Sequence, residues 1–580
     1  MAIASDKEPL VKWRISVTWL ALTAAACGSA PAPRPAAGQP ADLVIVNGRV
    51  FTADERGTTA QAVAIAGNKI LLVGTNDAVS ALRGPQTRVV DAHGGTVAPG
   101  FNDSHVHFIS GGMTLGHVDL AGLTTLALVQ DKIRAFAATH ADAPWVEGRG
   151  WLYSPFPGGT PTREQLDAAV PDRPAVMTCY DGHSVWVNSK ALALAGITKD
   201  TPSPANGLVV KDPRTGQPTG HLKESAAALI DSVVPKPTDA DRHAALRKAV
   251  AHAHQFGVTS VQNAGTSFDD VALYQQALRA GELQVRAYLA MSTSSSTTEA
   301  DLDRMEETRK ALGNDPTLTT GAVKIYADGV IESRTAAMLA PYENSKASGA
   351  PNLTADQLDH LVAMVDKRGW QIFIHAIGDR AIRMSLDAFE RAAAANPAPS
   401  RGRRHRIEHI EAAAAADIPR FGKLGVIASQ QPMHVPLGDM NSEHPSGPWP
   451  DNIGAERYSR AWAWKRIQNA GGRLTFGSDW PVAPLDAGLG IWVVTTRKGP
   501  ASEVDQKLPM SDAIDGYTRW PAYASFEEGR KGTLASGMLA DIVVLTTDVF
   551  TNRPVKAGDV VVDTTIFDGR IVYERSRAGR

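Results

Sequence analysis

Two histidines in the segment Asp103-Ser-His105-Val-His107 have a spacing that suits a metal ion. The apolar residues before them predict a β-strand, and residues i and i+2 of a strand point to the same face of its sheet. Both imidazoles could therefore bind one cation through a ring nitrogen. By itself the pair is a weak signal, because two half-buried structural histidines would show the same spacing.

Three more candidate ligands each end another apolar run: His375 in IFIH, His409 in RIEH and Asp479 in FGSD. Taken singly, each is typical of a structural polar group. With the histidine pair they place five nitrogen or oxygen ligands at four strand ends. Such a set suits Zn²⁺, or another borderline divalent ion, better than Ca²⁺ or Mg²⁺.

Lys324 lies inside the apolar run Ala322-Val-Lys324-Ile-Tyr. A buried ammonium is costly unless it is neutralised or modified. One interpretation is a lysine that reaches solvent or forms an ion pair. The other is a carboxylated lysine, whose anionic carbamate could bridge two metal ions.

These residues belong to an alternating series of predicted strands and helices. Eight strand-like runs cover residues 97–108, 257–265, 283–291, 321–329, 370–378, 404–411, 425–434 and 473–482. Helical patterns separate many of them, such as Arg242 to Phe256, and Thr354 with Gln357 forms a capping box that opens another helix. The β-then-α order predicts an α/β fold, a (β/α)8 barrel in which the carboxyl ends of the strands form the active-site face.

The regions around this barrel divide into two parts. Residues from about 110 to 242 are too many for a loop and predict a subdomain inserted after the first barrel strand, with helices at 126–140 and from Thr162. Short β-patterns over residues 42–95 are echoed at 526–580, where ADIVVL resembles the earlier ADLVIV. We expect both ends to form one small composite β-sandwich domain around a barrel of residues 96–525.

The first 27 residues have the features of a signal peptide. Lys12 and Arg14 precede an apolar run that ends before Cys27, and the run is too short to span a membrane. The alanines before Cys27 resemble a bacterial lipobox, although Ala24 stands where that motif usually has leucine. A Pro-rich linker follows over residues 28–41. We expect an exported bacterial protein, periplasmic or lipid-anchored through Cys27; ordinary cleavage and an unstructured tail are the alternatives.

The overall composition excludes several classes of function. Across 580 residues, 59 Lys+Arg against 61 Asp+Glu gives a net charge of −2, so the chain lacks the charge excess of a nucleic-acid-binding or membrane-surface protein. Two cysteines exclude a disulfide scaffold and a Cys-rich zinc site. We therefore expect small-molecule partners, with membrane attachment only through the N-terminus.

The sequence resembles the amidohydrolase superfamily, in the amidohydrolase-3 or YtcJ-like branch that includes N-substituted formamide deformylases. The matching phrases cover nearly the whole chain after Pro40: ADLVIVNGRV, APGFNDSHVHF, PDRPAVMTCYDGHSVWVNSKAL, GQPTGHLKESA, VKIYADGVIESRTAAM, FIHAIGDRAI, RIEHIE, FGSDWPV and LASGMLADIVVL. The resemblance implies a metal site at His105, His107, Lys324, His375, His409 and Asp479, and it favours carboxylation of Lys324. Asn102 and Glu332 depart from the usual pattern beside these positions.

The resemblance also implies the chemistry. Such a site would cleave amide-type, non-peptide C–N bonds of a small molecule by attack of a metal-bound hydroxide, with one or two ions, expected to be Zn²⁺. Asp479 would take the water proton and deliver it to the leaving nitrogen. Dimers are common among enzymes of this kind, which is compatible with a homodimer.

Five further residues are candidates for binding the substrate. The resemblance places His183 near the pocket, and His434 could meet the substrate oxygen. Arg334 could pair with a substrate carboxylate or form a structural salt bridge. Trp151 and Tyr153 could form an aromatic wall, although core packing is the favoured explanation.

Two rival functions are less well supported. Related cytosine-deaminase-like enzymes, mononuclear on the same barrel, carry Glu three residues after the fifth-strand histidine, and this chain has Gly378 there. An exported lipoprotein that binds a ligand without catalysis is expected to have lost metal ligands. All six positions are filled here.

Overall fold

A computed structural model describes residues 40–205, 207–436, 447–498, 505–551 and 555–576. The predicted signal peptide and nearly all of the predicted linker lie outside these ranges. Within them, no helix combines the length and apolar character needed to cross a membrane.

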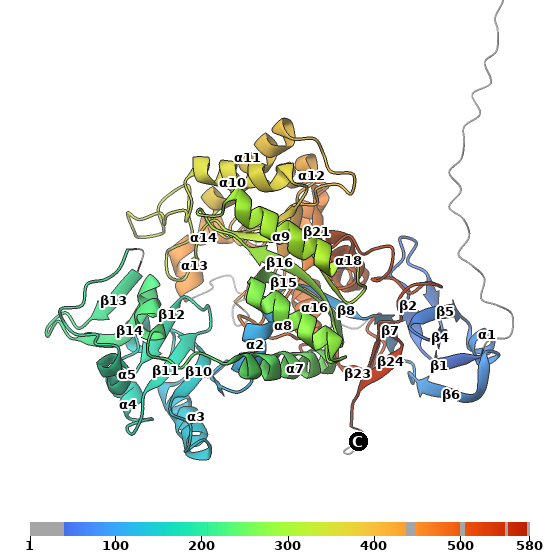
Figure 1. Ribbon diagram of the computed structural model, residues 1–580, viewed down its shortest axis with the longest axis horizontal. Helices are drawn as coiled ribbons and strands as arrows, with labels where there is room; N and C mark the ends of the chain where they lie inside the picture. Colours follow the sequence, from blue (N-terminus) through green and yellow to red (C-terminus); the bar gives the residue numbers. More distant parts are fainter. Residues whose placement is uncertain (1–39, 206, 437–446, 499–504, 552–554, 577–580) are drawn as a thin grey trace, which may run out of the picture.

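The centre of the molecule is a barrel of eight parallel strands, which confirms the predicted fold (Figure 1). Their order around the barrel is their order in the chain: β8 (Phe101–Val106), β15 (Val258–Thr266), β16 (Arg286–Ser292), β17 (Leu318–Tyr326), β18 (Gln371–Ala376), β19 (Arg406–His409), β20 (Ile427–Gln430) and β21 (Arg473–Phe476). The barrel closes beyond β21, where Val106 bridges to Trp480 and the backbone N–H of His107 donates to the Trp480 carbonyl at 2.8 Å.

Helices cover the outside of the barrel, so nearly all residues of its strands are buried. The helices between and after the strands are α7 (Asp239–Gln255), α8 (Phe268–Arg279), α9 (Glu299–Leu312), α10 (Ala355–Lys367), α11 (Asp379–Ala395), α12 (Ile418–Leu424), α15 (Trp464–Asn469), α16 (Ala487–Thr496), α17 (Met510–Asp515) and α18 (Arg519–Ala524). Shorter helices lie in the loops: α2 (Phe108–Thr114), α13 (Pro448–Ile453) and α14 (Ala455–Tyr458).

Capping residues set the starts of these helices. Thr354 and Gln357 form the predicted capping box of α10. The helix expected from Arg242 begins three residues earlier, at Asp239, because Thr238 caps it and the Asp241 carboxylate accepts the Thr238 N–H at 2.9 Å. Aspartate at this position replaces the longer acid of the usual capping box.

The insertion contains a six-stranded sheet in the order β13-β14-β12-β11-β10-β9 (Figure 1). Its strands are β9 (Val118–Asp119), β10 (Val146–Trp151), β11 (Ala175–Cys179), β12 (Ser184–Val187), β13 (Gly207–Lys211) and β14 (Pro218–Glu224). The helices α3 (Leu126–Thr139), α4 (Arg163–Asp167), α5 (Ser189–Leu194) and α6 (Ala228–Asp231) accompany it. The sequence pointed to helices here but gave no sign of the sheet.

Strands from the two ends of the chain lie together in a separate β domain. One of its sheets has the order β5-β4-β1-β6, from β1 (Ala41–Val46), β4 (Ala62–Ala66), β5 (Lys69–Gly74) and β6 (Arg83–Asp91), with α1 (Asn76–Ser80). The other has the order β24-β23-β22-β7-β2-β3, from β2 (Arg49–Phe51), β3 (Thr59–Ala60), β7 (Thr96–Pro99), β22 (Ile542–Leu545), β23 (Val562–Phe567) and β24 (Arg570–Glu574). Ile45 and Ile542 share the apolar core between these sheets.

A buried ion cluster attaches this domain to the barrel. Arg286, at the start of β16, donates to Asp541 at 2.9 Å and to Asp568 at 2.8 Å, and its side chain is 1% exposed. His254, on α7, lies 2.7 Å from the carbonyl of Gln284, so it has a packing role. The β domain therefore contacts the barrel at the amino end of β16, while residues of the insertion line a cavity at the carboxyl ends of the strands.

Candidate metal centre

Side chains from the ends of β8 and β21, the two strands at which the barrel closes, meet at the carboxyl ends of the strands. Nε2 of His107 lies 3.2 Å from Oδ1 of Asp479, and Nε2 of His105 lies 3.4 Å from the same oxygen. One ligand atom from each of the three falls within 4.8 Å of the others, a spacing that could hold a metal ion. The Asp479 N–H donates to the His105 carbonyl at 2.7 Å, which ties the two strand ends together.

Two further histidines stand beside this cluster. The ring of His409 lies 4.9 Å from that of His105 and 4.4 Å from that of His375, measured between centroids. The backbone of His409 has φ 73°, so the strand ends there and the side chain turns inward. Nε2 of His375 faces the carbonyl of Gly329 at 3.2 Å, so this residue adjoins the ligand cluster without joining it.

Buried atoms without partners support a candidate cation site at this position. Nδ1 of His409, Oδ1 of Asp479 and Nε2 of His434 are buried and have no hydrogen-bond partner among the described residues. Buried polar atoms nearly always have a hydrogen-bond partner, so three unpartnered atoms in one place indicate a binding position for a ligand or an ion. Nitrogen and carboxylate donors fit a divalent transition metal.

Burial keeps His105, His375 and His409 neutral, the form that binds metals. Burial, followed by the charge of Lys324, lowers the pKa of His105 to about 4. Burial also lowers the pKa of His409 and of His375 well below the usual value. Burial alone would raise the pKa of Asp479, but His105 and His107 hold it well below its usual range, so the carboxylate is ionised.

Lys324 is fully buried at the end of β17, with Nζ 3.4 Å from Nε2 of His105. Burial lowers its pKa to about 8, although Glu408 and Asp479 act in the opposite direction. Among the described residues Lys324 forms no salt bridge. The structure therefore does not support the interpretation that a direct ion pair neutralises this lysine.

His434 lies against the same cluster, on the turn after β20. Its ring stacks parallel to that of His409 at 5.7 Å, and its Nε2 lies 3.6 Å from Oδ2 of Asp479. Its other nitrogen lies 3.1 Å from Glu411, which also accepts the indole N–H of Trp449 at 2.6 Å. Burial would lower the pKa of His434, but Glu411 and Asp479 raise it. Glu411 was not among the residues expected from the sequence. Only its position two residues after His409 pointed to it.

A cavity of about 1680 Å³ opens onto these residues, with His107, Lys324, His375, His409 and Asp479 in its wall. Ligand sites usually measure about 300–1000 Å³, so the space exceeds what a small amide needs. The insertion supplies another part of the wall, from β10, β13 and β14 and from the loops that follow β10 and β11. A molecule bound at the metal centre would therefore also touch the insertion.

Two of the predicted substrate residues line the cavity from the insertion. The Tyr153 hydroxyl donates to Asp181 at 3.0 Å. Nδ1 of His183 lies 2.9 Å from Glu224. Burial would lower the pKa of His183, but Glu224 raises it to about 9, so the ring is cationic at neutral pH.

Trp151 is a correction to the predicted aromatic wall. Its side chain is fully buried in the core of the insertion, it packs against Phe156, and its indole N–H donates to the carbonyl of Met177 at 2.7 Å. It does not line the cavity, because successive residues of a strand point to opposite faces, and Gly150 before it and Leu152 after it are the ones in the cavity wall.

Arg334 and Glu332 line the cavity from the loop after β17. Nε of Arg334 donates to Asn452 at 2.7 Å, and no described carboxylate pairs with it, so the structural salt bridge considered for it is absent. Glu332 accepts the Tyr180 hydroxyl at 2.9 Å. Burial, and then the charges of Glu411 and Asp181, raise the pKa of Glu332 to about 8.

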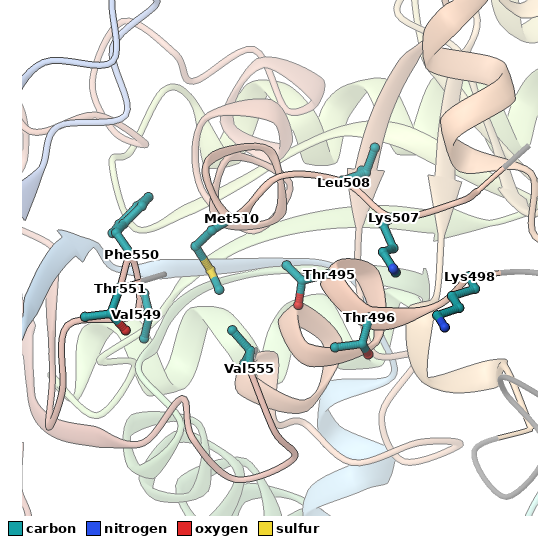
Figure 2. A pocket seen from close by; sticks show the side chains of 10 residues that line it. All are labelled: Thr495, Thr496, Lys498, Lys507, Leu508, Met510, Val549, Phe550, Thr551 and Val555. Carbon is teal, nitrogen blue, oxygen red and sulfur yellow. The ribbon is translucent and has the colours of Figure 1, made fainter. Parts of the chain in front are cut away.

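A second hollow of about 450 Å³ lies where the end of α16 meets the loop after β22 (Figure 2). Figure 2 shows its wall of threonine, apolar and lysine side chains. None of the described residues that line it is a histidine, cysteine or carboxylate. It therefore offers no metal ligands, and the strand ends of the barrel remain the candidate site.

Comparison with known proteins agrees with this geometry. The family model described as "Amidohydrolase family" matches residues 88–573. The putative amidohydrolase YtcJ of Bacillus subtilis is 31% identical over 546 residues, which cover 91% of this chain and 99% of that protein. N-substituted formamide deformylase of Arthrobacter pascens is 28% identical over 92% of this chain and 99% of its own length.

A solved structure shows the same fold. An uncharacterized metal-dependent hydrolase from Pyrococcus furiosus superposes with a TM-score of 0.68 at 25% identity, covering 88% of this chain and all of that one. The chain therefore belongs to the amidohydrolase family, and it is a metal-dependent hydrolase of carbon–nitrogen bonds.

Proposed function

We propose that this protein hydrolyses an amide-type, non-peptide C–N bond of a small molecule at a divalent-metal centre. The ligands would be His105, His107, Lys324, His375, His409 and Asp479. The observation that carries the proposal is the convergence of His105, His107 and Asp479 within 4.8 Å beside orphaned buried nitrogens. When bound, a Zn²⁺-like ion would supply Lewis acidity and a water nucleophile near neutral pH.

Lys324 is proposed to be carboxylated and to complete a two-ion site. The support is its complete burial and its position 3.4 Å from a candidate ligand, without a carboxylate partner among the described residues. A carbamate would convert this cation into an anionic oxygen ligand. With an unmodified lysine, the same residues would hold one ion.

Asp479 is proposed as the group that moves protons. Its carboxylate is ionised and faces both histidines of β8, so it could accept a proton from the attacking water. The same oxygen could then return that proton to the leaving nitrogen. His434 is proposed to meet the carbonyl oxygen of the substrate, because its unpartnered Nε2 faces the same space.

The substrate class is proposed from the cavity and the relatives together. The name of the Arthrobacter pascens relative, N-substituted formamide deformylase, suggests amides with a bulky N-substituent. The size of the cavity and its wall of Tyr153 and His183 fit such a substituent. The cavity wall carries side chains of both signs, such as Lys223 and Glu224, which suits a small molecule with polar groups.

A deaminase on the same barrel is disfavoured by Gly378. A Cβ at this position would lie 2.1 Å from the Ala337 carbonyl, so the glutamate expected of such enzymes does not fit. A ligand-binding protein without catalysis is disfavoured because none of the six candidate metal-binding positions has lost its side chain.

We also propose that the protein is exported through residues 1–27 and is either periplasmic or lipid-anchored at Cys27, and that it forms a homodimer. The support for export is the sequence of the first residues alone. Metabolic labelling with a radioactive fatty acid, compared between the native chain and Cys27→Ala, would separate an anchored protein from one cleaved by the ordinary route.

Metal analysis and a substrate panel test the central proposal. We expect about two ions per chain, an activity that depends on bicarbonate during metal loading, and turnover of N-formyl, N-acyl or cyclic amides. One ion with full activity would contradict carboxylation of Lys324. Metal-loaded protein that turns over none of these amides would contradict the proposed reaction.

A further inference from the structure

We propose that Lys223 and Arg334 form an anion-binding subsite in the large cavity, which selects substrates that carry a carboxylate on the group beyond the scissile amide. The inference rests on the proposed amide hydrolysis and adds a recognition element on the wall shared by the insertion and the loop after β17. Both side chains line the same cavity as the candidate metal ligands.

Lys223 lies on β14, in register with Ser184 of β12 and Leu208 of β13. It is half-buried, and among the described residues its ammonium makes no hydrogen bond and no salt bridge. Burial lowers its pKa, and the charge of Arg334 lowers it further. Holding an ammonium partly out of water without a direct partner costs free energy, which a bound anion would recover.

Arg334 is held in place, while its terminal nitrogens have no partner among the described residues. Its Nε donates to Oδ1 of Asn452 at 2.7 Å, and the amide nitrogen of Asn452 donates to the carbonyls of Ile331 at 2.9 Å and Glu332 at 3.0 Å. These bonds fix the direction of the guanidinium without using the two groups that bind carboxylates as a fork. Its backbone φ of 63° is uncommon for a residue other than glycine, which indicates that the surrounding structure holds Arg334 in this position.

The acidic residues of the same wall are occupied elsewhere. Glu224 pairs with His183 at 2.9 Å and accepts the Ser333 hydroxyl at 2.7 Å. Asp181 accepts the Tyr153 hydroxyl at 3.0 Å and the His183 N–H at 2.9 Å. These carboxylates act on Lys223 only through longer-range charge.

Glu332 does not neutralise the charges of Lys223 and Arg334 either. Burial raises its pKa to about 8, so it is largely uncharged at neutral pH. Two cations, whose terminal donors have no partner in the part of the chain that the structure describes, therefore face a cavity that is larger than a small amide requires. A carboxylate-bearing substituent is the chemical complement of that wall.

Two substrates with the same scissile bond test the inference: N-formylbenzylamine and its para-carboxylate. For the metal-loaded enzyme we expect kcat/KM to favour the carboxylate at least about tenfold, mainly through KM. In K223M this ratio should fall by about tenfold, the size expected when one charge-assisted hydrogen bond is lost. R334Q should lower the same ratio.

A matched control separates local binding from a general loss of positive charge. Lys199 is exposed on the same insertion and pairs with Asp200, so K199M removes the same charge outside the cavity and should leave the ratio unchanged. Equal kcat/KM for the two substrates, or an unchanged ratio in K223M, would overturn the subsite.

Binding of para-toluate, which has no amide bond, tests the subsite apart from hydrolysis. By calorimetry we expect the native protein to bind it about tenfold more tightly than K223M does. If neither formamide is hydrolysed but this difference persists, the proposed reaction fails and the subsite stands. Equal affinity for both proteins would overturn the subsite whatever the reaction.

Discussion

Glu408 fixes the orientation of His105: its Oε2 lies 2.5 Å from Nδ1 of the ring, and neither side chain is exposed. Arg406 donates to the other oxygen of Glu408 at 2.8 Å. Burial alone would raise the pKa of Glu408, but Arg406 and His105 lower it, so Glu408 is an anion. A hydrogen bond at Nδ1 leaves Nε2 to face Asp479, as a metal ligand requires.

Replacing this carboxylate should weaken metal binding without removing a ligand. In Glu408→Gln we expect the affinity for Zn²⁺ to fall by about 10–100-fold, because the amide is a poorer acceptor and no longer sets the ring orientation. Competition with a coloured chelator would measure it. Glu390→Gln, on the exposed α11 surface, is the control; equal affinities in both variants would contradict the role.

Asp479→Asn tests the proposed proton transfer. The amide keeps the shape of the side chain but accepts a proton far less readily, so we expect kcat to fall by at least about 100-fold. Metal content, measured on the same sample, should stay close to that of the native protein, because the histidines remain. A near-normal kcat in this variant would refute the role of Asp479.

The sequence could predict the barrel and its ligands because two regular features coincide. Each barrel strand is a short apolar run, and polar residues at the ends of parallel strands must meet at one face. His105, His409 and Asp479 follow this rule, since each comes at or just after the end of its strand. Their convergence needed only the strand order.

What the sequence could not predict depends on local backbone geometry. His409 and Ile410 both have positive φ, so the strand alternation stops there and gives no guide to the direction of Glu411. Trp151 stands next to the cavity in the chain but faces the opposite side of β10. Strands of the insertion are short and interrupted by glycines such as Gly150 and Gly220, which removes the period that would reveal them.

Gly378 offers a test of packing behind the site. It precedes α11, and a Cβ there would lie 2.1 Å from the carbonyl oxygen of Ala337. Because this oxygen belongs to the backbone, it cannot move without displacing the chain. In Gly378→Ala we expect the free energy of unfolding to fall by about 1–3 kcal/mol, measured by denaturant titration. Gly529→Ala, where a Cβ meets nothing within 4 Å, should change it by less than about 0.5 kcal/mol. A smaller loss in Gly378→Ala than in the control would contradict the predicted clash.

The ion pair of His183 with Glu224 should make stability depend on pH. Glu224 raises the pKa of the folded His183 to about 9 from an unfolded value near 6.5. The pair therefore stabilises the protein fully below the unfolded pKa, as long as Glu224 is ionised, and the gain is lost as pH rises through 9. We expect Glu224→Gln to lower the free energy of unfolding by about 1.5–3 kcal/mol at pH 6 and by much less at pH 10. Glu164→Gln, an exposed residue of the same insertion, controls for net charge and should show little change at either pH. A loss in Glu224→Gln that grows with pH would show that His183 is neutral in the folded protein, because only a folded-state pKa above the unfolded one gives the sign predicted here.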